Sequence, residues 1–166
     1  MLIAFILFGA CGNQEKPEEK TPLTSYKEPL INANKKLVKT EDELISDYIR
    51  RYQWDMKTTG TGLRYLIYKE GSGPLAKKGQ IAKINYTVNL LTGELCYSSE
   101  ITGPKEFLIG KGNVEAGIEE GILLLNKGGR AKFILPSHLA FGLMGDSDKI
   151  PAKATLVYDV ELIDLN

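Results

Sequence analysis

The sequence is poor in the side chains that build metal sites, disulfide frameworks and acid–base catalytic centres. Its 166 residues include two cysteines and one histidine, too few for the four ligands of a structural zinc site or for a disulfide framework. The 21 basic residues are balanced by 21 acidic ones, so no bulk field attracts nucleic acid or anionic lipid. No apolar run approaches the roughly 18 residues of a membrane-spanning helix. We therefore expect no metal and no nucleic-acid partner.

Motifs for covalent or phosphate chemistry are also missing. The sequence contains no G-x-S-x-G elbow, no phosphate-binding P-loop and no HExxH motif. A nucleophilic mechanism would depend on His138, which has no identifiable partner, and we interpret it as a solvent-facing loop residue. Glu115, Glu119 and Glu120 open a short helix, where their charges complement the helix dipole. After these exclusions, the sequence leaves an apolar cavity that contains aromatic side chains as the candidate site, and we expect no cofactor.

The first eleven residues are typical of an export signal. Residues 1–11 form an uncharged apolar run that ends in Gly9-Ala10-Cys11. This ending resembles the lipobox of bacterial lipoproteins, in which the cysteine is acylated and becomes the mature N-terminus. The pattern therefore predicts a lipid anchor at Cys11, and a cleaved signal peptide without lipid is the alternative. Cys96 is the only other thiol, and we interpret it as a small buried hydrophobe because no basic cluster activates it.

A tether and one amphipathic helix follow the signal. Residues 12–39 contain three prolines, mixed charges and no sustained apolar period, a composition that favours a flexible linker. Thr40 and Glu43 form a capping box that starts a helix over residues 40–58. Its apolar stripe consists of Leu44, Ile45, Tyr48, Ile49, Tyr52 and Met56. We expect the stripe to pack on its own domain, with a dimer through residues 40–57 as the alternative.

From residue 62 onward the pattern changes to the period of two that is typical of strands. Strand-like segments cover residues 63–67, 82–90, 94–98, 105–109, 130–135 and 155–165. The only helical stretch in this half is 114–124, and residues 137–153 form a long loop that contains glycine. Residues 62–166 are therefore expected to form one α+β domain, in which a curved antiparallel sheet wraps around one short helix.

Several short motifs occur in a fixed order along this half. They are Gly79-Gln80, Asn85-Tyr86-Thr87, Phe107-Leu108-Ile109-Gly110, Val114 with Gly117-Ile118-Glu119-Glu120-Gly121, Gly129-Arg130-Ala131, Leu139-Ala140-Phe141-Gly142, Ile150-Pro151 and Ala154-Thr155-Leu156-Val157-Tyr158-Asp159-Val160-Glu161-Leu162. In that order they resemble the FKBP-type peptidyl-prolyl isomerases, from about residue 62 to the C-terminus. The resemblance implies the FKBP-like half-roll and catalysis of rotation about the peptide bond that precedes proline.

The resemblance also implies a pocket for the proline ring. Its walls would be Tyr86, Phe107, Val114, Phe141 and Tyr158. Ile118 would form the floor, and Ile150 would line the overhanging loop. The backbone N–H of Glu115 would donate a hydrogen bond to a substrate carbonyl.

Several positions of this pocket depart from the family pattern. The floor, most often tryptophan, is Ile118, and the usual Phe-Asp pair after the hairpin is Cys96-Tyr97. Lys105 stands where an aromatic residue is common, and Phe141 replaces a tyrosine whose hydroxyl usually bonds ligand. Two alternatives therefore stay open: an active isomerase, or a catalytically weakened peptide-binding chaperone or scaffold.

A second resemblance concerns the start of the chain. Gly60-Thr61-Gly62-Leu63-Arg64-Tyr65, together with the lipobox, resembles the gliding-motility-associated FKBP-type lipoproteins of gliding bacteria. It implies an isomerase held by lipid in the bacterial cell envelope, facing the periplasm, with the outer membrane as the expected membrane. The partners would be proline-containing segments of exported proteins, including those of a gliding apparatus. A structural component that assembles through helix 40–57 is the third alternative.

Overall fold

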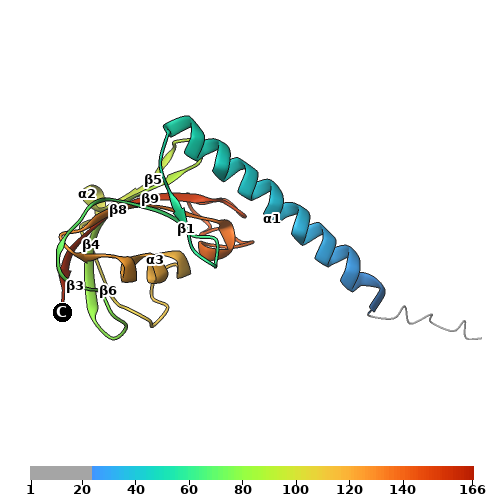
Figure 1. Cartoon of the computed structure of the whole chain (residues 1–166). Helices are drawn as coiled ribbons and strands as arrows, with labels where there is room; N and C mark the ends of the chain where they lie inside the picture. The colour runs from blue at the N-terminus through green and yellow to red at the C-terminus, as the bar shows by residue number, and fades with distance from the viewer. Residues whose placement is uncertain (1–23) are drawn as a thin grey trace, which may run out of the picture. The chain divides into compact units, whose positions relative to one another are not determined.

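A seven-stranded antiparallel sheet curves around one short helix in the computed structural model, which describes residues 24–166 (Figure 1). The strands lie in the order β1-β2-β8-β9-β4-β5, and β6 also pairs with β4. Their bounds are β1 Lys57–Thr58, β2 Arg64–Lys69, β4 Ile81–Leu90, β5 Leu95–Ser98, β6 Lys105–Leu108, β8 Arg130–Leu135 and β9 Leu156–Leu165. A separate two-stranded ribbon joins β3 (Ser72–Leu75) to β7 (Asn126–Lys127). The predicted α+β fold with a curved antiparallel sheet is confirmed.

The two long central strands, β4 and β9, set the two faces of the sheet. They pair antiparallel from Ala82 opposite Leu165 to Leu90 opposite Leu156. Successive side chains alternate between the faces, so Tyr158 belongs to the main apolar core while its neighbour Asp159 lies on the opposite face. The alternation predicted for residues 155–165 is therefore confirmed.

The short helix α3, Ala116–Gly121, fills the hollow of the sheet and continues into a 3₁₀ turn, Ile122–Leu124. Glycine allows the helix to approach the strands closely, because a Cβ at Gly121 would lie 2.9 Å from the ring of Phe133. Ile118 and Ile122 pack from this helix into the main core. Two further short elements complete the half-roll: α2 (Ser99–Thr102) and a 3₁₀ turn at Ser137–Leu139.

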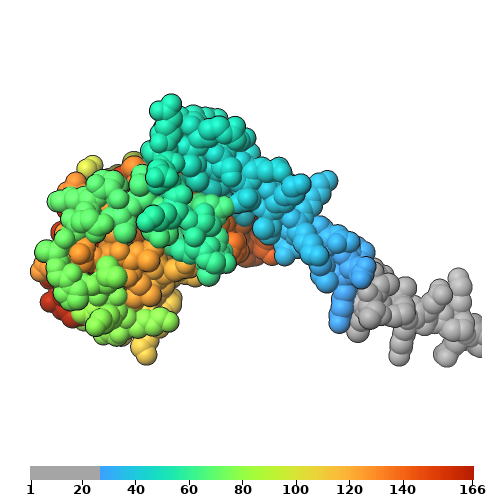
Figure 2. Space-filling view, viewed as in Figure 1, coloured from blue at the N-terminus to red at the C-terminus, as the bar shows by residue number. Residues whose placement is uncertain are grey.

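The helix α1 spans Thr24–Tyr52, and its C-terminal part packs on the domain. Ile45 and Tyr48 form a second, smaller core with Ile134 of β8 and Val157 of β9. The end of α1 and the segment after it (teal) lie directly against the strands that follow (green) in the space-filling view (Figure 2). The expectation that this stripe packs on its own domain is confirmed, although Leu44 and Tyr52 stay exposed.

The predicted start of this helix, and with it the tether over residues 24–39, is wrong. The helix begins at Thr24 and includes Pro29, which lies in its second turn, where the missing N–H removes a hydrogen bond to the carbonyl four residues earlier. Thr40 does not cap a helix start, because its hydroxyl donates to the carbonyl of Lys36 one turn earlier, at 3.0 Å. The signal over residues 1–11, Cys11 and the tether over residues 12–23 lie outside the described residues.

The predicted end of the helix, at residue 58, is also wrong. Gln53 has a positive φ of 54°, and the N–H of Trp54 donates to the carbonyl of Ile49 at 3.1 Å, so the chain leaves the helix in a left-handed turn. Met56 then packs on the second core from outside the helix. The two residues after it form β1, which pairs with β2.

Candidate functional site

The structure gathers the predicted pocket residues on the concave side of the sheet. Strands supply Tyr86 (β4), Cys96 and Tyr97 (β5), Phe107 (β6) and Tyr158 (β9), whereas Ile118 comes from α3 and Val114 from the segment before it. Phe141 and Ile150 come from residues 137–155, hereafter the pocket loop, which connect β8 to β9. All nine belong to the main core cluster or pack against it. Residues separated by more than 70 positions in the sequence therefore meet at one place.

The members of this cluster differ in exposure. Phe107, Ile118, Ile150 and Tyr158 expose only 2–4% of their surface. Tyr86, Tyr97, Val114 and Phe141 are half-buried around them. The apolar floor is thus covered, and the half-buried side chains are the ones that an incoming ligand would contact first. Phe141 and Ile150 belong to the pocket loop, so a displacement of this loop displaces both residues.

Glu115 adds a polar group to this apolar site. It precedes α3, and its carbonyl accepts hydrogen bonds from the N–H groups of Ile118 and Glu119 at 2.9 and 3.0 Å. Burial, together with the negative charge and hydrogen bonding of the Glu115 carboxylate, raises the pKa of Tyr158 well above its usual range. The Tyr158 hydroxyl therefore stays protonated at neutral pH and can donate a hydrogen bond inside the pocket.

Tyr97 fastens the pocket loop to β5. Its hydroxyl donates to the carboxylate of Asp146, which in turn accepts from the N–H groups of Asp148 and Ile150 at 2.9 and 2.8 Å. The hydrogen bond to Asp146 raises the pKa of Tyr97 to about 12. Burial opposes ionisation of Asp146, but the hydrogen bonds from Tyr97 and the two N–H groups outweigh it and lower the pKa of that carboxyl. Tyr97 thus affects the pocket indirectly, because it holds the loop that carries Ile150.

Cys96 is a buried residue, as predicted. It exposes 3% of its surface, and burial raises the pKa of its thiol. The thiol lies 3.8 Å from the carbonyl oxygen of Lys149 in the pocket loop. A raised pKa leaves little thiolate at neutral pH, so Cys96 contributes packing rather than a nucleophile.

The acidic residues of α3 do more than complement its dipole. The carboxylate of Glu119 accepts hydrogen bonds from the N–H groups of Gly110 and Gly112, the latter at 2.9 Å, and so fixes the segment that leads to Val114. Glu120 accepts from the hydroxyl of Thr61 at 2.6 Å. A cavity of about 440 Å³ lies beside these residues and Val114. Sequence reasoning missed both roles, because the motifs that contain Gly110 and Thr61 do not show which side chain their backbone and hydroxyl groups contact.

His138 is exposed, as predicted, and its Nε2 lies 2.9 Å from the carbonyl oxygen of Thr61. This contact fixes the start of the pocket loop rather than a reacting group. Residues 24–166 contain no group of three or more His, Cys, Asp or Glu side chains arranged to hold a metal ion.

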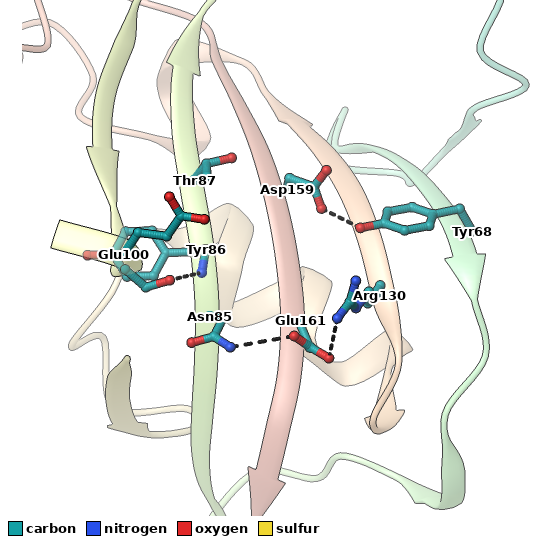
Figure 3. Close-up of a pocket in the computed structure, with 9 residues that line it drawn as sticks. Tyr68, Asn85, Tyr86, Thr87, Glu100, Arg130, Asp159 and Glu161 are labelled. Atoms are coloured by element: carbon teal, nitrogen blue, oxygen red, sulfur yellow. Dashed lines mark hydrogen bonds and ion pairs between the residues drawn. The ribbon is translucent and has the colours of Figure 1, made fainter. Parts of the chain in front are cut away.

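A second pocket, of about 430 Å³, lies on the other face of the sheet (Figure 3). Several of its polar groups pair with one another: Tyr68 donates to Asp159 at 2.5 Å, and Arg130 and Asn85 donate to Glu161 at 2.9 and 3.5 Å. The hydrogen bond from Arg130 lowers the pKa of Glu161. The outward-facing polar residues of β4, β8 and β9 were visible in the strand alternation, but nothing in the sequence showed that they enclose a pocket. Arg130 is the one basic residue among those lining this pocket, against the three acidic residues Glu100, Asp159 and Glu161, so the pocket is negatively charged.

Comparison with known proteins assigns the chain to a family. The sequence model described as "FKBP-type peptidyl-prolyl cis-trans isomerase" matches residues 73–163, which is more than half of the chain. The protein belongs to the FKBP-type peptidyl-prolyl cis-trans isomerase family. The family resemblance and the half-roll that it implied are confirmed.

Relatives and solved structures agree with this assignment. The probable FKBP-type isomerase FkpA of Neisseria meningitidis is 40% identical over 111 residues, which cover 66% of this chain and 40% of that protein. FK506-binding protein 2 of Dictyostelium discoideum is 44% identical over 91 residues, 54% of this chain and 68% of that protein. The crystal structure of FkpA from Escherichia coli matches with a TM-score of 0.68 and 30% identity over 87% of this chain and 70% of that one.

The match covers only part of the bacterial relatives. The chain spans 40% of the Neisseria protein and 46% of a probable FKBP-type isomerase of Haemophilus influenzae. Within residues 24–166, none of the helices combines the length and the apolar character needed to cross a membrane.

Proposed function

We propose that this protein is a peptidyl-prolyl cis-trans isomerase that acts on proline-containing segments of exported proteins. The observation that carries the proposal is the convergence of Tyr86, Phe107, Ile118 and Tyr158 in one apolar cluster of an FKBP-type domain. This cluster surrounds no nucleophile or metal ligand set, and prolyl isomerisation requires neither.

The reaction needs only differential stabilisation of a twisted amide. Rotation about the bond is opposed by the loss of resonance, a barrier of roughly 18–20 kcal/mol. A thousandfold acceleration requires that this barrier be lowered by about 4 kcal/mol. The planar imide is more dipolar than the twisted one, so apolar walls such as Phe107 and Ile118 disfavour the ground state.

A fixed hydrogen-bond donor would hold the substrate in the twisted geometry. Within the described residues, the N–H of Glu115 donates to no protein acceptor, so it is free to bind a substrate carbonyl. The Tyr158 hydroxyl stays protonated because of its raised pKa, and it becomes a second donor at the same site when its proton turns from the Glu115 carboxylate to the substrate. The N–H of Glu115 is positioned before the substrate arrives, which is the condition for effective electrostatic stabilisation.

Exchange spectroscopy on an Ala-Pro peptide tests the proposal. Cis–trans cross-peaks should grow with the concentration of purified protein, and His138→Ala should retain this activity because His138 lies outside the pocket. The alternative, a peptide-binding chaperone or scaffold with little turnover, is favoured by Ile118 at the floor and Lys105 at the rim. It predicts peptide chemical-shift changes without faster exchange.

We propose further that the protein is anchored by lipid at Cys11 in the cell envelope, facing the periplasm and most simply in the outer membrane. The support is the apolar run over residues 1–11 that ends in Gly9-Ala10-Cys11. Metabolic labelling with an alkyne fatty acid should tag the wild-type chain in bacterial cells and not Cys11→Ser. Labelling of both proteins, or of neither, would reject the anchor.

The client proteins are proposed to include parts of a gliding apparatus. The support is the likeness of Gly60–Tyr65 and of the lipobox to gliding-associated lipoproteins. Deletion of the gene in a gliding bacterium should reduce colony spreading, and a copy with Phe107→Ala should fail to restore it. Normal spreading of the deletion strain would remove this role.

A dimer through α1 is also proposed. Ile45 and Tyr48 of the predicted stripe pack on the domain. Three other apolar side chains of α1 remain 48–55% exposed: Leu37, Val38 and Leu44. Apolar side chains spaced in this way can pair two helices. Light scattering should give twice the monomer mass, and Leu37→Glu combined with Leu44→Glu should restore the monomer. A monomeric wild type would exclude this dimer.

A further inference from the structure

The two ends of the pocket loop are bound by one side chain of α1. Oε1 of Glu41 accepts hydrogen bonds from the N–H of Ser137 and from the hydroxyl of Thr155, each at 2.6 Å. Oε2 lies 3.1 Å from the hydroxyl of Ser137, which donates to it. Ser137 opens the pocket loop and Thr155 closes it, so a single carboxylate holds residues that are 18 positions apart.

These contacts involve a charged acceptor that is half-buried and a Thr155 hydroxyl that is buried. Thr155 exposes 6% of its surface, and Glu41 is the partner of its hydroxyl. Hydrogen bonds to a carboxylate are about twice as strong as those between neutral groups. Without Glu41, a buried hydroxyl and a backbone N–H would lose their acceptor.

The rest of the pocket loop is ordered by its own hydrogen bonds. The N–H of Gly142 donates to the carbonyl of Ser137 at 2.8 Å, and the N–H of Lys153 donates to the carbonyl of Gly142 at 2.8 Å. The loop therefore behaves as a unit attached at Ser137 and Thr155. Where that unit sits decides where Phe141 and Ile150 stand against the covered floor of the pocket.

Two further contacts lie in the same region, and one of them, made by His138, also holds the start of the pocket loop. Asp42 pairs with Arg64 at the start of β2, and the ring of His138 contacts the carbonyl of Thr61. Asp42 therefore holds α1 to the domain without touching the pocket loop. The neighbouring Glu43 lies on the exposed side of α1, 3.9 Å from Lys39. The helix thus supplies two matched control positions adjacent to Glu41.

We propose that Glu41 is a positioning residue for the pocket: by fixing both ends of the pocket loop, it sets the wall formed by Phe141 and Ile150 before a substrate binds. The part of this proposal that concerns substrate rests on the proposed function. The residue lies outside the segment that the family model matches, residues 73–163. A helix added to the common domain would thereby become part of the binding site.

Preorganisation gives the direction of the effect. A wall that is already in place need not be ordered when the ligand binds, so loosening it weakens affinity more than it slows the bound-state reaction. In Glu41→Ala of the full chain, KM for a proline peptide should rise three- to tenfold while kcat changes by less than twofold. Hydrogen exchange of peptides covering residues 137–155 should accelerate at least tenfold. Glu41→Gln should recover most of the wild-type behaviour, because its amide can accept from Ser137 and Thr155.

The control variants separate positioning from general loosening of α1. Asp42→Ala and Glu43→Ala should leave loop exchange and KM within twofold of the wild type. The proposal is overturned if Asp42→Ala reproduces the effects of Glu41→Ala, or if folded Glu41→Ala leaves loop exchange unchanged. If Glu41→Ala fails to fold, Thr155→Val removes one of the same hydrogen bonds and should accelerate loop exchange; unchanged exchange there rejects the proposal. A wild type without isomerase activity refutes the proposed function, whereas loop exchange still decides the role of Glu41.

Discussion

Phe107 is a buried aromatic side chain on β6 and the largest apolar part of the proposed pocket wall that β6 supplies. Replacing a buried phenylalanine by alanine removes the wall and leaves a cavity that costs about 3–5 kcal/mol of stability. Phe107→Ala should therefore lower isomerase activity at least tenfold in protein that remains folded. Activity would be measured by exchange spectroscopy at a temperature well below the unfolding midpoint of the variant.

Ile134→Ala is the matched control for Phe107→Ala. Ile134 is fully buried, but it belongs to the second core on the other face of the sheet. Its loss should cost about 2–5 kcal/mol of stability and leave turnover close to the wild-type value. Equal losses of activity in the two variants would show that stability, and not the pocket wall, determines turnover.

At the scale of single residues, the sequence predicted which apolar side chains are buried but not which polar groups contact one another. Tyr86 and Tyr158 were predictable as members of the apolar cluster because strand alternation assigns each to the inward side, and Phe107 because its motif resembles the family. Their contact with a proline ring stays a prediction. The contacts of Tyr97 with Asp146, and of Glu119 with the segment before Val114, were not predicted. A hydrogen bond across 49 positions depends on how the loops fold back, and no local pattern encodes it.

The pocket loop is held by an interaction that titrates. The pKa of Asp146 is lowered in the folded protein, so the ionised form stabilises the loop. This contribution is fully present above the ordinary aspartate pKa of about 3.9 and is lost as the pH falls through the lower folded value. The pKa of Tyr97 is raised to about 12, so the hydrogen bond from Tyr97 to Asp146 weakens only above the ordinary tyrosine pKa of about 10.

We expect the pocket loop to loosen at acid pH in a step that follows Asp146. In an NMR titration, the Ile150 amide should shift together with the Asp146 carboxyl carbon, at a pH below the ordinary aspartate range. In Asp146→Asn the acid step should disappear, and Ile150 should already exchange faster at neutral pH. An Asp146 carboxyl that titrates at its ordinary pH would contradict this account.

The helix α1 shows why an element can be identified while its bounds are missed. A proline at position 29 and a capping pattern at Thr40 both predict a later start, yet the helix begins at Thr24. Packing of Ile45 and Tyr48 on the sheet stabilises the helix from its other end, and helix propagation is cheap once a nucleus exists. Local signals of this kind mark where a helix can start, and tertiary packing decides whether it extends past them.

Packing of α1 on the domain should contribute measurably to the stability of the monomer. Ile45 exposes 1% of its surface, whereas its neighbour Leu44 exposes 55%. At protein concentrations low enough to keep the chain monomeric, Ile45→Ala should lower the free energy of unfolding by about 2–5 kcal/mol, and Leu44→Ala by less than about 0.5 kcal/mol. Urea unfolding of the two variants measures both values. Similar losses would show that Ile45 does not pack against the sheet in solution.

At the scale of the whole molecule, residues 36–166 form one compact unit. This unit contains both apolar cores and the pocket, and it begins within α1 rather than at residue 62, where the strand pattern begins. The sequence motifs located the family domain, and the compact unit adds residues 36–61 to it. Ile45 and Tyr48 pack on β8 and β9, as the apolar stripe predicted, whereas the contacts of Glu41 with Ser137 and Thr155 follow from no local pattern.

Truncation tests this boundary directly. A fragment of residues 36–166 should unfold in one cooperative transition, because it keeps both cores and the Glu41 contacts. A fragment that starts at residue 57 also loses Ile45 and Tyr48, so it exposes Ile134 and Val157 to water and leaves the Thr155 hydroxyl without its acceptor. We expect this shorter fragment to be less stable by at least about 3 kcal/mol, with faster hydrogen exchange across the pocket loop. Equal unfolding midpoints for the two fragments would mean that the family domain folds without α1, and the helix would then have no part in shaping the pocket.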